Sequence, residues 1–381
     1  MIYFDNAATT FPKPGAVVRE MVRCMREWGG NPGRSGHALS LAASEAIYSV
    51  REELASFFGL TRAENIVFTQ NCTHALNLVI SGIGRYGDHL LISNLEHNSV
   101  LRTVDQLCRL RGMSYDVFNG LGSDAELLAE IESKCKPRTR AVITVHASNV
   151  CPRRLPIGDI GALCRARGIL CIVDAAQSAG IYDISIPRDG ISALCAPGHK
   201  GLYGPQGSGF AAFADDFDFE MLLPSLYGGN GRSSAERGMG TVAPESYEAG
   251  TVATPAIVGL GAGVRFVRRL GTGRIAESEH QLFRYASRLI CGIPRAFLYL
   301  PEAREGSLLL LGFDGIAPSA VADRLAALGV CVRAGMHCAP TAHEALGTGG
   351  DALRVSFSAM NTLDEVTRFA HMLESVVGVM K

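Results

Sequence analysis

The chain has almost no net charge, because its positive and negative residues nearly cancel. This argues against several classes of partner. The 381 residues carry 36 Lys and Arg against 37 Asp and Glu, a formal net charge of −1. The basic surface that nucleic acids or anionic membranes attract is therefore missing, and we expect neither as a partner. No apolar run reaches the roughly 20 residues that span a bilayer. The N-terminus has no basic and apolar signal segment, so we expect a cytoplasmic protein.

Spacing motifs for disulfides and metals are also missing. The eleven cysteines are an odd number and are scattered without framework spacing, as is typical of buried thiols in a reducing compartment. A zinc site built from His337, Cys338 and His343 is a poor alternative, because no second pair of ligands with suitable spacing lies nearby. We therefore expect neither disulfides nor a bound metal.

The apolar content is high and its pattern indicates the fold class. Hydrophobic residues make up 47% of the chain and charged residues 19%, and a chain of this length is expected to form two domains. Short apolar segments alternate with helical periodicity, which predicts an α/β fold with a mostly parallel sheet covered by helices on both faces. Its predicted strands are Asn65–Thr69, His89–Ser93, Ala141–His146, Leu170–Val173, Ala193–Ala196 and Ser208–Phe213.

The two ends of the chain have a different pattern. Helices are predicted at Val17–Trp28 and at about Leu39–Phe58. After Thr251 the pattern becomes α+β, with helices at Pro255–Leu270, Glu277–Cys291 and Thr362–Val377 and strands at Ser307–Phe313, Val330–Arg333 and Ala352–Ser356. We expect a large domain at residues 15–255 and a small domain formed by residues 1–14 and 256–381.

One glycine-rich stretch, residues 193–209, contains the most informative lysine. Lys200 follows His199 among five glycines, whose backbone can approach a ligand closely. A desolvated lysine can form a Schiff base. Upstream, a buried strand ends at Asp174, where open α/β sheets bind ligands. Lysine and acid together suggest pyridoxal 5'-phosphate (PLP), with Asp174 pairing its ring nitrogen. A capping Asp, a solvated Lys and a glycine-rich hairpin are the structural alternative.

Polar residues follow several other predicted strands. Thr73 opens a helix after the first strand, where backbone amides can bind phosphate, although it could be a plain helix cap. This stretch is neither a P-loop nor a G-x-G-x-x-G fingerprint. His97 is placed to stack on a cofactor ring and exchange protons, or is an ordinary loop histidine. Asn149 and Gln177 are candidates to hydrogen-bond the phenolic oxygen of the cofactor.

A second informative stretch, residues 332–340, contains a candidate nucleophile. Cys338 lies between Arg333 and His337 on one side and Pro340 on the other, and cationic surroundings favour the reactive thiolate. Downstream, Arg354 is a strand arginine suited to a bidentate pair with a substrate carboxylate, or alternatively to an interdomain salt bridge.

Taken in order, these motifs resemble the cysteine desulfurase/selenocysteine lyase family of class-V, fold-type I PLP enzymes. The resemblance covers essentially the whole chain. The residues that carry it are Asn6–Thr10, Thr73, His97, Asn149, Asp174, Gln177, His199, Lys200, Glu248–Thr251, Arg333–Cys338 and Arg354.

The resemblance implies a role for each site residue. Lys200 resembles the lysine that bonds to PLP, and Cys338 the cysteine that becomes a persulfide. Asp174 is implied to pair with the ring nitrogen, and His97 to stack on the ring. The phenolic oxygen is implied to bind Gln177 and Asn149, the phosphate to bind Thr73, the adjacent His74 and His199, and the substrate to bind Arg354, Asn149 and Ala8. Thr251 is implied to come from a second subunit, which predicts a homodimer.

The sequence departs from the family pattern at two positions and leaves alternatives open. Pro197 stands where many relatives have a phosphate-binding serine, and His74 where an acidic or small polar residue is commoner. The short stretch between Cys338 and Arg354 is like the branch that passes its persulfide to a partner protein. The implied reaction takes L-cysteine to L-alanine. The alternatives are a selenocysteine lyase, another β-eliminating or aminotransferase-like PLP enzyme, and a non-catalytic sulfur-carrier or regulatory module. The acceptor and pathway, including iron–sulfur cluster assembly, stay open.

Overall fold

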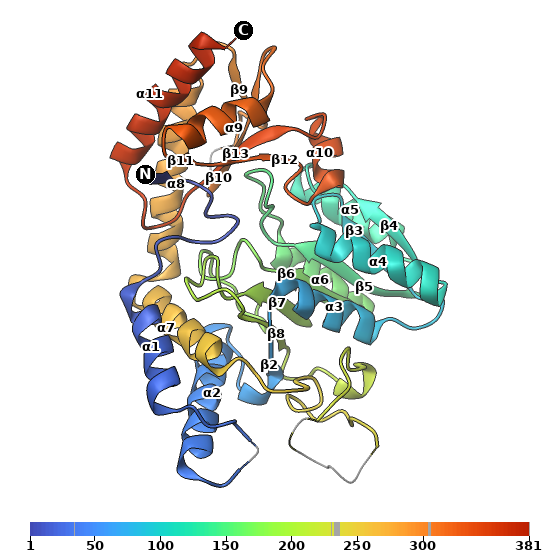
Figure 1. The fold of residues 1–381 in the computed structure, drawn as a ribbon. Helices are drawn as coiled ribbons and strands as arrows, with labels where there is room; N and C mark the ends of the chain where they lie inside the picture. Colours follow the sequence, from blue (N-terminus) through green and yellow to red (C-terminus); the bar gives the residue numbers. More distant parts are fainter. Residues whose placement is uncertain (34, 230, 232–236, 304–305, 381) are drawn as a thin grey trace.

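A computed structural model of the chain describes residues 1–33, 35–229, 231, 237–303 and 306–380. None of the helices formed by these residues is both long enough and apolar enough to cross a membrane. Figure 1 shows a central sheet with helices around it and, above it, a second group of strands and helices from the C-terminal part of the chain.

In the described part of the chain, the central sheet has seven strands in the order β2-β8-β7-β6-β5-β3-β4. All neighbours pair in parallel except β8, which is antiparallel to β2 and β7. The strands are β2 (Ile66–Thr69), β3 (His89–Ser93), β4 (Ser114–Phe118), β5 (Thr139–Val145), β6 (Leu170–Asp174), β7 (Ala193–Pro197) and β8 (Gly209–Phe213). The predicted α/β class with a mostly parallel sheet is therefore confirmed.

Alternation along the strands explains why helices cover both faces. Leu91 and Val142 belong to one apolar core, whereas their neighbours Ile92 and Ile143 belong to another on the opposite face. The connecting helices are α3 (Cys72–Ile83), α4 (Asn98–Arg111), α5 (Asp124–Lys134) and α6 (Ile157–Arg167). The start of α5 is fixed by a reciprocal capping box between Ser123 and Glu126.

The C-terminal part forms a four-stranded antiparallel sheet in the order β12-β13-β10-β9. Its elements are α8 (Thr272–Ile290), β9 (Ala296–Leu298), β10 (Leu308–Phe313), α9 (Pro318–Ala327), β11 (Val330–Cys331), β12 (Arg333–Gly335), α10 (Pro340–Leu346), β13 (Ala352–Ser356) and α11 (Leu363–Val379). The predicted strand Val330–Arg333 is in fact two strands, because β11 pairs with β1 (Ile2–Tyr3) and β12 pairs with β13. The chain's first residues thus lie among the elements of the C-terminal part (Figure 1).

The remaining helices pack beside the central sheet. They are α1 (Gly15–Glu27), α2 (Ala38–Phe57) and α7 (Thr254–Leu270), with short 3-10 turns at Ala63–Asn65 and Phe219–Met221. Ile257, Leu260 and Val264 of α7 belong to the core that includes the central sheet, whereas Ile2 and Phe4 belong to a separate core with β10, α9 and α11. We propose that these two cores are the two predicted domains, with α7 as the element that joins them.

Candidate active site

A cavity of about 240 Å³ lies at the carboxyl ends of β5, β6 and β7, where parallel sheets bind ligands. Nine of the residues singled out from the sequence line it: Ala8, Thr73, His97, Asn149, Asp174, Gln177, His199, Lys200 and Arg354. Asn71, Cys72, Arg333 and His337 are among the other lining residues. Segments far apart in the sequence therefore meet at one place.

Asp174 and Lys200 are an acid and an amine that line the same cavity. Asp174 ends β6 and is buried, and this burial raises its pKa although the Ala176 N–H and Lys200 act in the opposite direction. Its Oδ1 accepts the Ala176 N–H at 2.8 Å and lies 3.6 Å from the Cys72 thiol. Desolvation, followed by the charge of Arg354, lowers the pKa of Lys200, which Asp174 opposes. A lowered pKa leaves more of the amine unprotonated, which is the form that acts as a nucleophile or a base.

The turn that carries Lys200 is held by the N-terminal segment. Gly198 donates its N–H to Ser208 O at 2.8 Å, and a Cβ at this position would lie only 2.1 Å from Ser208 Oγ, so no larger residue fits. The carbonyl of His199 accepts hydrogen bonds from Thr10 N at 3.1 Å and from Lys13 Nζ at 2.7 Å. Burial lowers the pKa of Lys13 to about 8. In the sequence Thr10 was noted only as part of the Asn6–Thr10 motif, and Lys13 was missed.

The predicted phosphate ligands divide between two places. Thr73 and His199 line the cavity, but Thr73 is not the helix cap, because Asn71 Oδ1 accepts the His74 N–H at 2.9 Å. His74 lines a separate hollow that also includes Thr251. Thr73 and His74, although adjacent on the helix, thus line two different hollows. The assignment of His74 as a cofactor ligand stays a prediction.

His97 caps α4 instead of presenting a free ring. Its Nδ1 accepts the Ser99 N–H at 3.0 Å. Burial, followed by the charge of Lys200, lowers the pKa of His97 to about 4. The imidazole is therefore neutral at physiological pH, and its role in proton exchange stays a prediction. It lies at the cavity wall, as a ring-stacking residue would.

The two amides expected to donate to a phenolic oxygen are already engaged. Gln177 Nε2 donates to Ala7 O at 2.9 Å, and Asn149 Nδ2 donates to His337 O at 2.7 Å. Asn149 Oδ1 is buried without a partner among the described residues. Both side chains line the cavity, but in this arrangement their donors bind the protein itself.

Arg354 on β13 is fully buried and joins the two ends of the chain to the cavity. Its Nη2 pairs with Asp5 Oδ1 at 2.9 Å, and its Nη1 donates to Asn149 O at 2.8 Å. Its Nε has no partner in the described ranges. The salt bridge with Asp5 lies within the predicted small domain, so it is not the interdomain pair given as the alternative, and the guanidinium lines the cavity.

Cys338 lies just outside the cavity wall, in the loop after β12. Its Sγ is 3.8 Å from Arg333 Nη2, and its carbonyl accepts the Asn98 N–H at 2.7 Å. Both Arg333 and His337 line the cavity. The arginine places positive charge next to the thiol.

Sequence reasoning also missed a buried carboxyl next to His97. Glu96 Oε1 accepts the Val145 N–H at 2.7 Å and the Ser93 hydroxyl at 2.5 Å. Burial raises the pKa of Glu96 to about 8, and the charge of Asp174 adds to this. A glutamate three residues after the fully buried strand β3 could have indicated this buried group.

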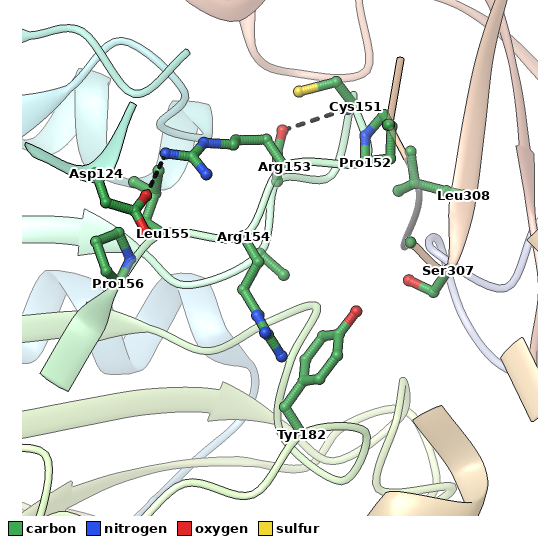
Figure 2. A pocket seen from close by; sticks show the side chains of 14 residues that line it. Asp124, Cys151, Pro152, Arg153, Arg154, Leu155, Pro156, Tyr182, Ser307 and Leu308 are labelled. Atoms are coloured by element: carbon green, nitrogen blue, oxygen red, sulfur yellow. Dashed lines mark hydrogen bonds and ion pairs between the residues drawn. The ribbon is translucent and has the colours of Figure 1, made fainter. Parts of the chain in front are cut away.

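A larger cavity of about 390 Å³ lies elsewhere, between residues 147–156 and the start of β10. Figure 2 shows Arg154 directed toward Tyr182, and its guanidinium lies 4.7 Å from the ring centre. Arg153 is engaged by Asp124 at 2.7 Å. None of the predicted site residues lines this cavity, and burial raises the pKa of its Cys151 to about 11. A thiol with a raised pKa is less often in its reactive thiolate form, so the smaller cavity is the candidate active site.

Comparison with known proteins identifies the family. Residues 2–369 match the profile described as aminotransferase class-V. The chain belongs to this family. Among related class-V proteins, a probable cysteine desulfurase of Methanothermobacter thermautotrophicus is 32% identical, with 99% of this chain and 95% of the relative covered. A cysteine desulfurase of Salmonella agona is 31% identical, with 97% and 91% covered.

A solved structure supports the same assignment. The apo cysteine desulfurase of Thermococcus onnurineus superimposes with a TM-score of 0.91 at 31% identity, covering 100% of this chain and 95% of that one. Class-V aminotransferases are PLP-dependent, and the cavity of this class-V chain fits that cofactor. Lys200 supplies an amine, Asp174 an acid, and Asn149 Oδ1 and His199 Nδ1 are buried polar atoms without a partner among the described residues. No three His, Cys, Asp or Glu side chains in the described ranges are grouped to hold a metal ion.

Proposed function

We propose that this class-V protein is a PLP-dependent cysteine desulfurase that converts L-cysteine to L-alanine and retains the sulfur as a persulfide on Cys338. The observation that carries the proposal is the meeting of Lys200 and Asp174 in one cavity with a thiol-bearing loop at its wall. Many PLP enzymes need only the first two groups. Sulfur transfer also requires a thiol, and here a cysteine lies beside an arginine at the edge of the same cavity.

When bound, PLP supplies a carbonyl that condenses with amines and a ring that accepts an electron pair. Asp174 would hold the ring nitrogen protonated, and His97 would lie against the ring. Thr73 and His199 would hold the phosphate. Gln177 and Asn149 would lie near the phenolic oxygen after their present donors exchange partners.

The protein's own groups then carry out the proton and sulfur transfers. Lys200 Nζ takes the proton from the substrate Cα, because its lowered pKa leaves more of the amine unprotonated. Arg354 binds the substrate carboxylate by sharing the guanidinium that now pairs with Asp5, and Ala8 and Asn149 contact the substrate. Cys338 Sγ bonds to the substrate sulfur as the C–S bond breaks. The electron pair of that bond stays on the carbon skeleton, which leaves as alanine after protonation.

The assembly and cell compartment are part of the proposal. We place the protein in the cytoplasm as a homodimer, with Thr251 completing the phosphate site of the partner subunit. Thr251 is exposed and lies outside its own chain's cavity, with its hydroxyl accepting only an Asn31 amide bond at 3.3 Å among the contacts of the described residues. The persulfide on Cys338 would be passed to an acceptor protein, with iron–sulfur cluster assembly as one destination.

The direct test is incubation of the PLP-loaded protein with L-cysteine while alanine, sulfide and pyruvate are quantified together. We expect alanine, and mass spectrometry should locate one added sulfur on the peptide that contains Cys338. Pyruvate and sulfide without a modified Cys338 would instead indicate a β-eliminating enzyme. Turnover of L-selenocysteine alone would indicate a lyase, and no turnover of either amino acid a non-catalytic module.

A further inference from the structure

The backbone of the Cys338 loop is unusual in the described chain. His337 and Cys338 are consecutive non-glycine residues with φ angles of 49° and 58°, in the left-handed region that side chains with a Cβ disfavour. Such a conformation persists only when surrounding contacts hold it. Two contacts come from residues that follow strands of the central sheet. Asn149 Nδ2 donates to His337 O, and the Asn98 N–H donates to Cys338 O, both at 2.7 Å.

A third set of contacts lies beneath the loop. His337 Nε2 is 3.1 Å from Arg333 O, and His337 Nδ1 is 3.2 Å from His343 Nε2. The two imidazole planes differ by only 14°. His343 Nδ1 is in turn 2.6 Å from Thr348 Oγ1, which accepts the Gly350 N–H at 3.2 Å. Five side-chain and backbone groups, joined by four hydrogen bonds, therefore form one hydrogen-bond chain from Gly350 to Arg333.

The groups at the two ends of this hydrogen-bond chain fix the direction of every hydrogen bond in it. A carbonyl only accepts, so His337 carries its proton on Nε2, and its Nδ1 must accept from His343 Nε2–H. His343 Nδ1 then accepts from the Thr348 hydroxyl. Burial, followed by the charge of Arg354, lowers the pKa of His337 to about 3, and burial also lowers that of His343, against the charge of Asp351. Both rings are therefore neutral at pH 7, as this order requires.

We propose that His343 and Thr348 are positioning residues for Cys338: through His337 they hold the thiol in its left-handed loop beside Arg333. This inference rests on the proposed function, in which Cys338 is the nucleophile. His343 is buried at 1% exposure, and neither it nor Thr348 lines the cavity, so both act only through the loop. The same hydrogen-bond chain ends on the carbonyl of Arg333. It therefore positions the residue whose guanidinium lies 3.8 Å from the thiol as well as the loop that carries the thiol.

The direction of these hydrogen bonds predicts what happens when the Thr348 hydroxyl is removed. In Thr348→Val the side-chain shape is kept, but His343 Nδ1 loses its donor and the Gly350 N–H loses its acceptor. If the proton on His343 moved to Nδ1, Nε2 could no longer donate to His337. A shift of the thiol by about 1 Å is enough to slow an oriented attack roughly 10²-fold. Thr348→Ser keeps the hydroxyl and is the conservative rescue.

The experiment measures persulfide formation on Cys338 and steady-state turnover of L-cysteine in PLP-loaded wild type, Thr348→Val and Thr348→Ser. We expect the valine variant to lower kcat and the persulfide rate about 10- to 100-fold while KM and the absorbance change on adding L-cysteine, which needs no thiol, stay unchanged. The serine variant should lie within about threefold of wild type. A matched control is His89→Leu, which removes another buried histidine bonded to a threonine, at the opposite end of β3.

Each outcome decides the proposal. Wild-type persulfide rates in Thr348→Val would overturn it, as would an equal loss in His89→Leu or in Thr348→Ser. If Thr348→Val does not fold, His343→Gln against His343→Leu replaces it, since glutamine can still donate to His337 and accept from Thr348; equal rates in that pair would overturn the inference. A wild-type protein that forms no persulfide on Cys338 refutes the proposed function and the inference together, whereas a normal wild type with an unaffected valine variant refutes the inference alone.

Discussion

Replacing Glu96 with glutamine should change how the stability of the protein depends on pH. The carboxyl is fully buried, and its pKa rises from 4.5 to about 8, chiefly through burial. Between these two pH values the folded chain holds a proton on Glu96 that the unfolded chain releases. The resulting contribution to stability is complete below pH 4.5 and is lost as the pH rises through 8.

The size of the effect follows from the same two values. One pKa unit corresponds to about 1.36 kcal/mol, so the free energy of unfolding of the wild type should fall by about 4 kcal/mol between about pH 5 and pH 8 through this group alone. Glu96→Gln keeps an oxygen that accepts the Ser93 hydroxyl and the Val145 N–H but cannot ionise. The variant should therefore gain about 4 kcal/mol relative to wild type over this range.

The assay is denaturant-induced unfolding of both PLP-loaded proteins at several pH values. Taking the difference between variant and wild type cancels the contributions of other titrating groups. Glu45→Gln, on the exposed face of α2, serves as the control and should give a difference that does not vary with pH. A difference between Glu96→Gln and wild type that stayed constant from about pH 5 to pH 8 would refute the reasoning that Glu96 is protonated in the folded protein.

Three further predictions concern the proposed chemistry. Lys200→Ala should abolish both the visible absorbance of the bound cofactor linkage and turnover, as measured by spectrophotometry and alanine release; cysteine turnover in this variant would exclude Lys200 as the PLP lysine. Asp174→Asn should still fold by circular dichroism but bind PLP weakly and lose most activity, since a neutral amide does not stabilise a protonated ring nitrogen, and near wild-type turnover would leave Asp174 a purely structural role. Cys338→Ser should keep the absorbance change on addition of L-cysteine but release alanine at least about 100-fold more slowly, because a hydroxyl attacks sulfur poorly; equal alanine release by Cys338→Ser and wild type would contradict the sulfur-transfer step.

Much of the fold was predictable because apolar periodicity is strong in buried strands. His89–Ser93 was predicted at its observed bounds, and β2 and β5–β8 within two residues at either end. β4 was missed because it lies at the edge of the sheet and its first two residues are exposed. The predicted helix at Glu277 begins five residues earlier, at Thr272, because its first turn is largely solvent-facing and breaks the apolar rhythm.

The site was predictable where residues follow strand ends and unpredictable where distant segments supply the partners. Lys200 and Asp174 meet because parallel strands end at one edge of the sheet. The pairing of Arg354 with Asp5, and of Gln177 with Ala7, depends on the N-terminal segment crossing to the cavity, which no local pattern encodes. The hydrogen-bond chain from Gly350 to Arg333 depends on α10 turning back under the loop, which spacing alone does not reveal.

The position of the first thirteen residues sets an order in which the molecule can be completed during synthesis. β1 pairs with β11, which lies more than 320 residues later in the sequence, and Thr10 and Lys13 hold the turn that carries Lys200. The central sheet can pair as it emerges from the ribosome, but the N-terminal segment has no strand to join until residue 330 has been made. Contacts of such long sequence separation form slowly. A chain that stops before β11 therefore leaves β1 without the strand with which it pairs in the finished molecule, and leaves out Cys338 and Arg354 as well.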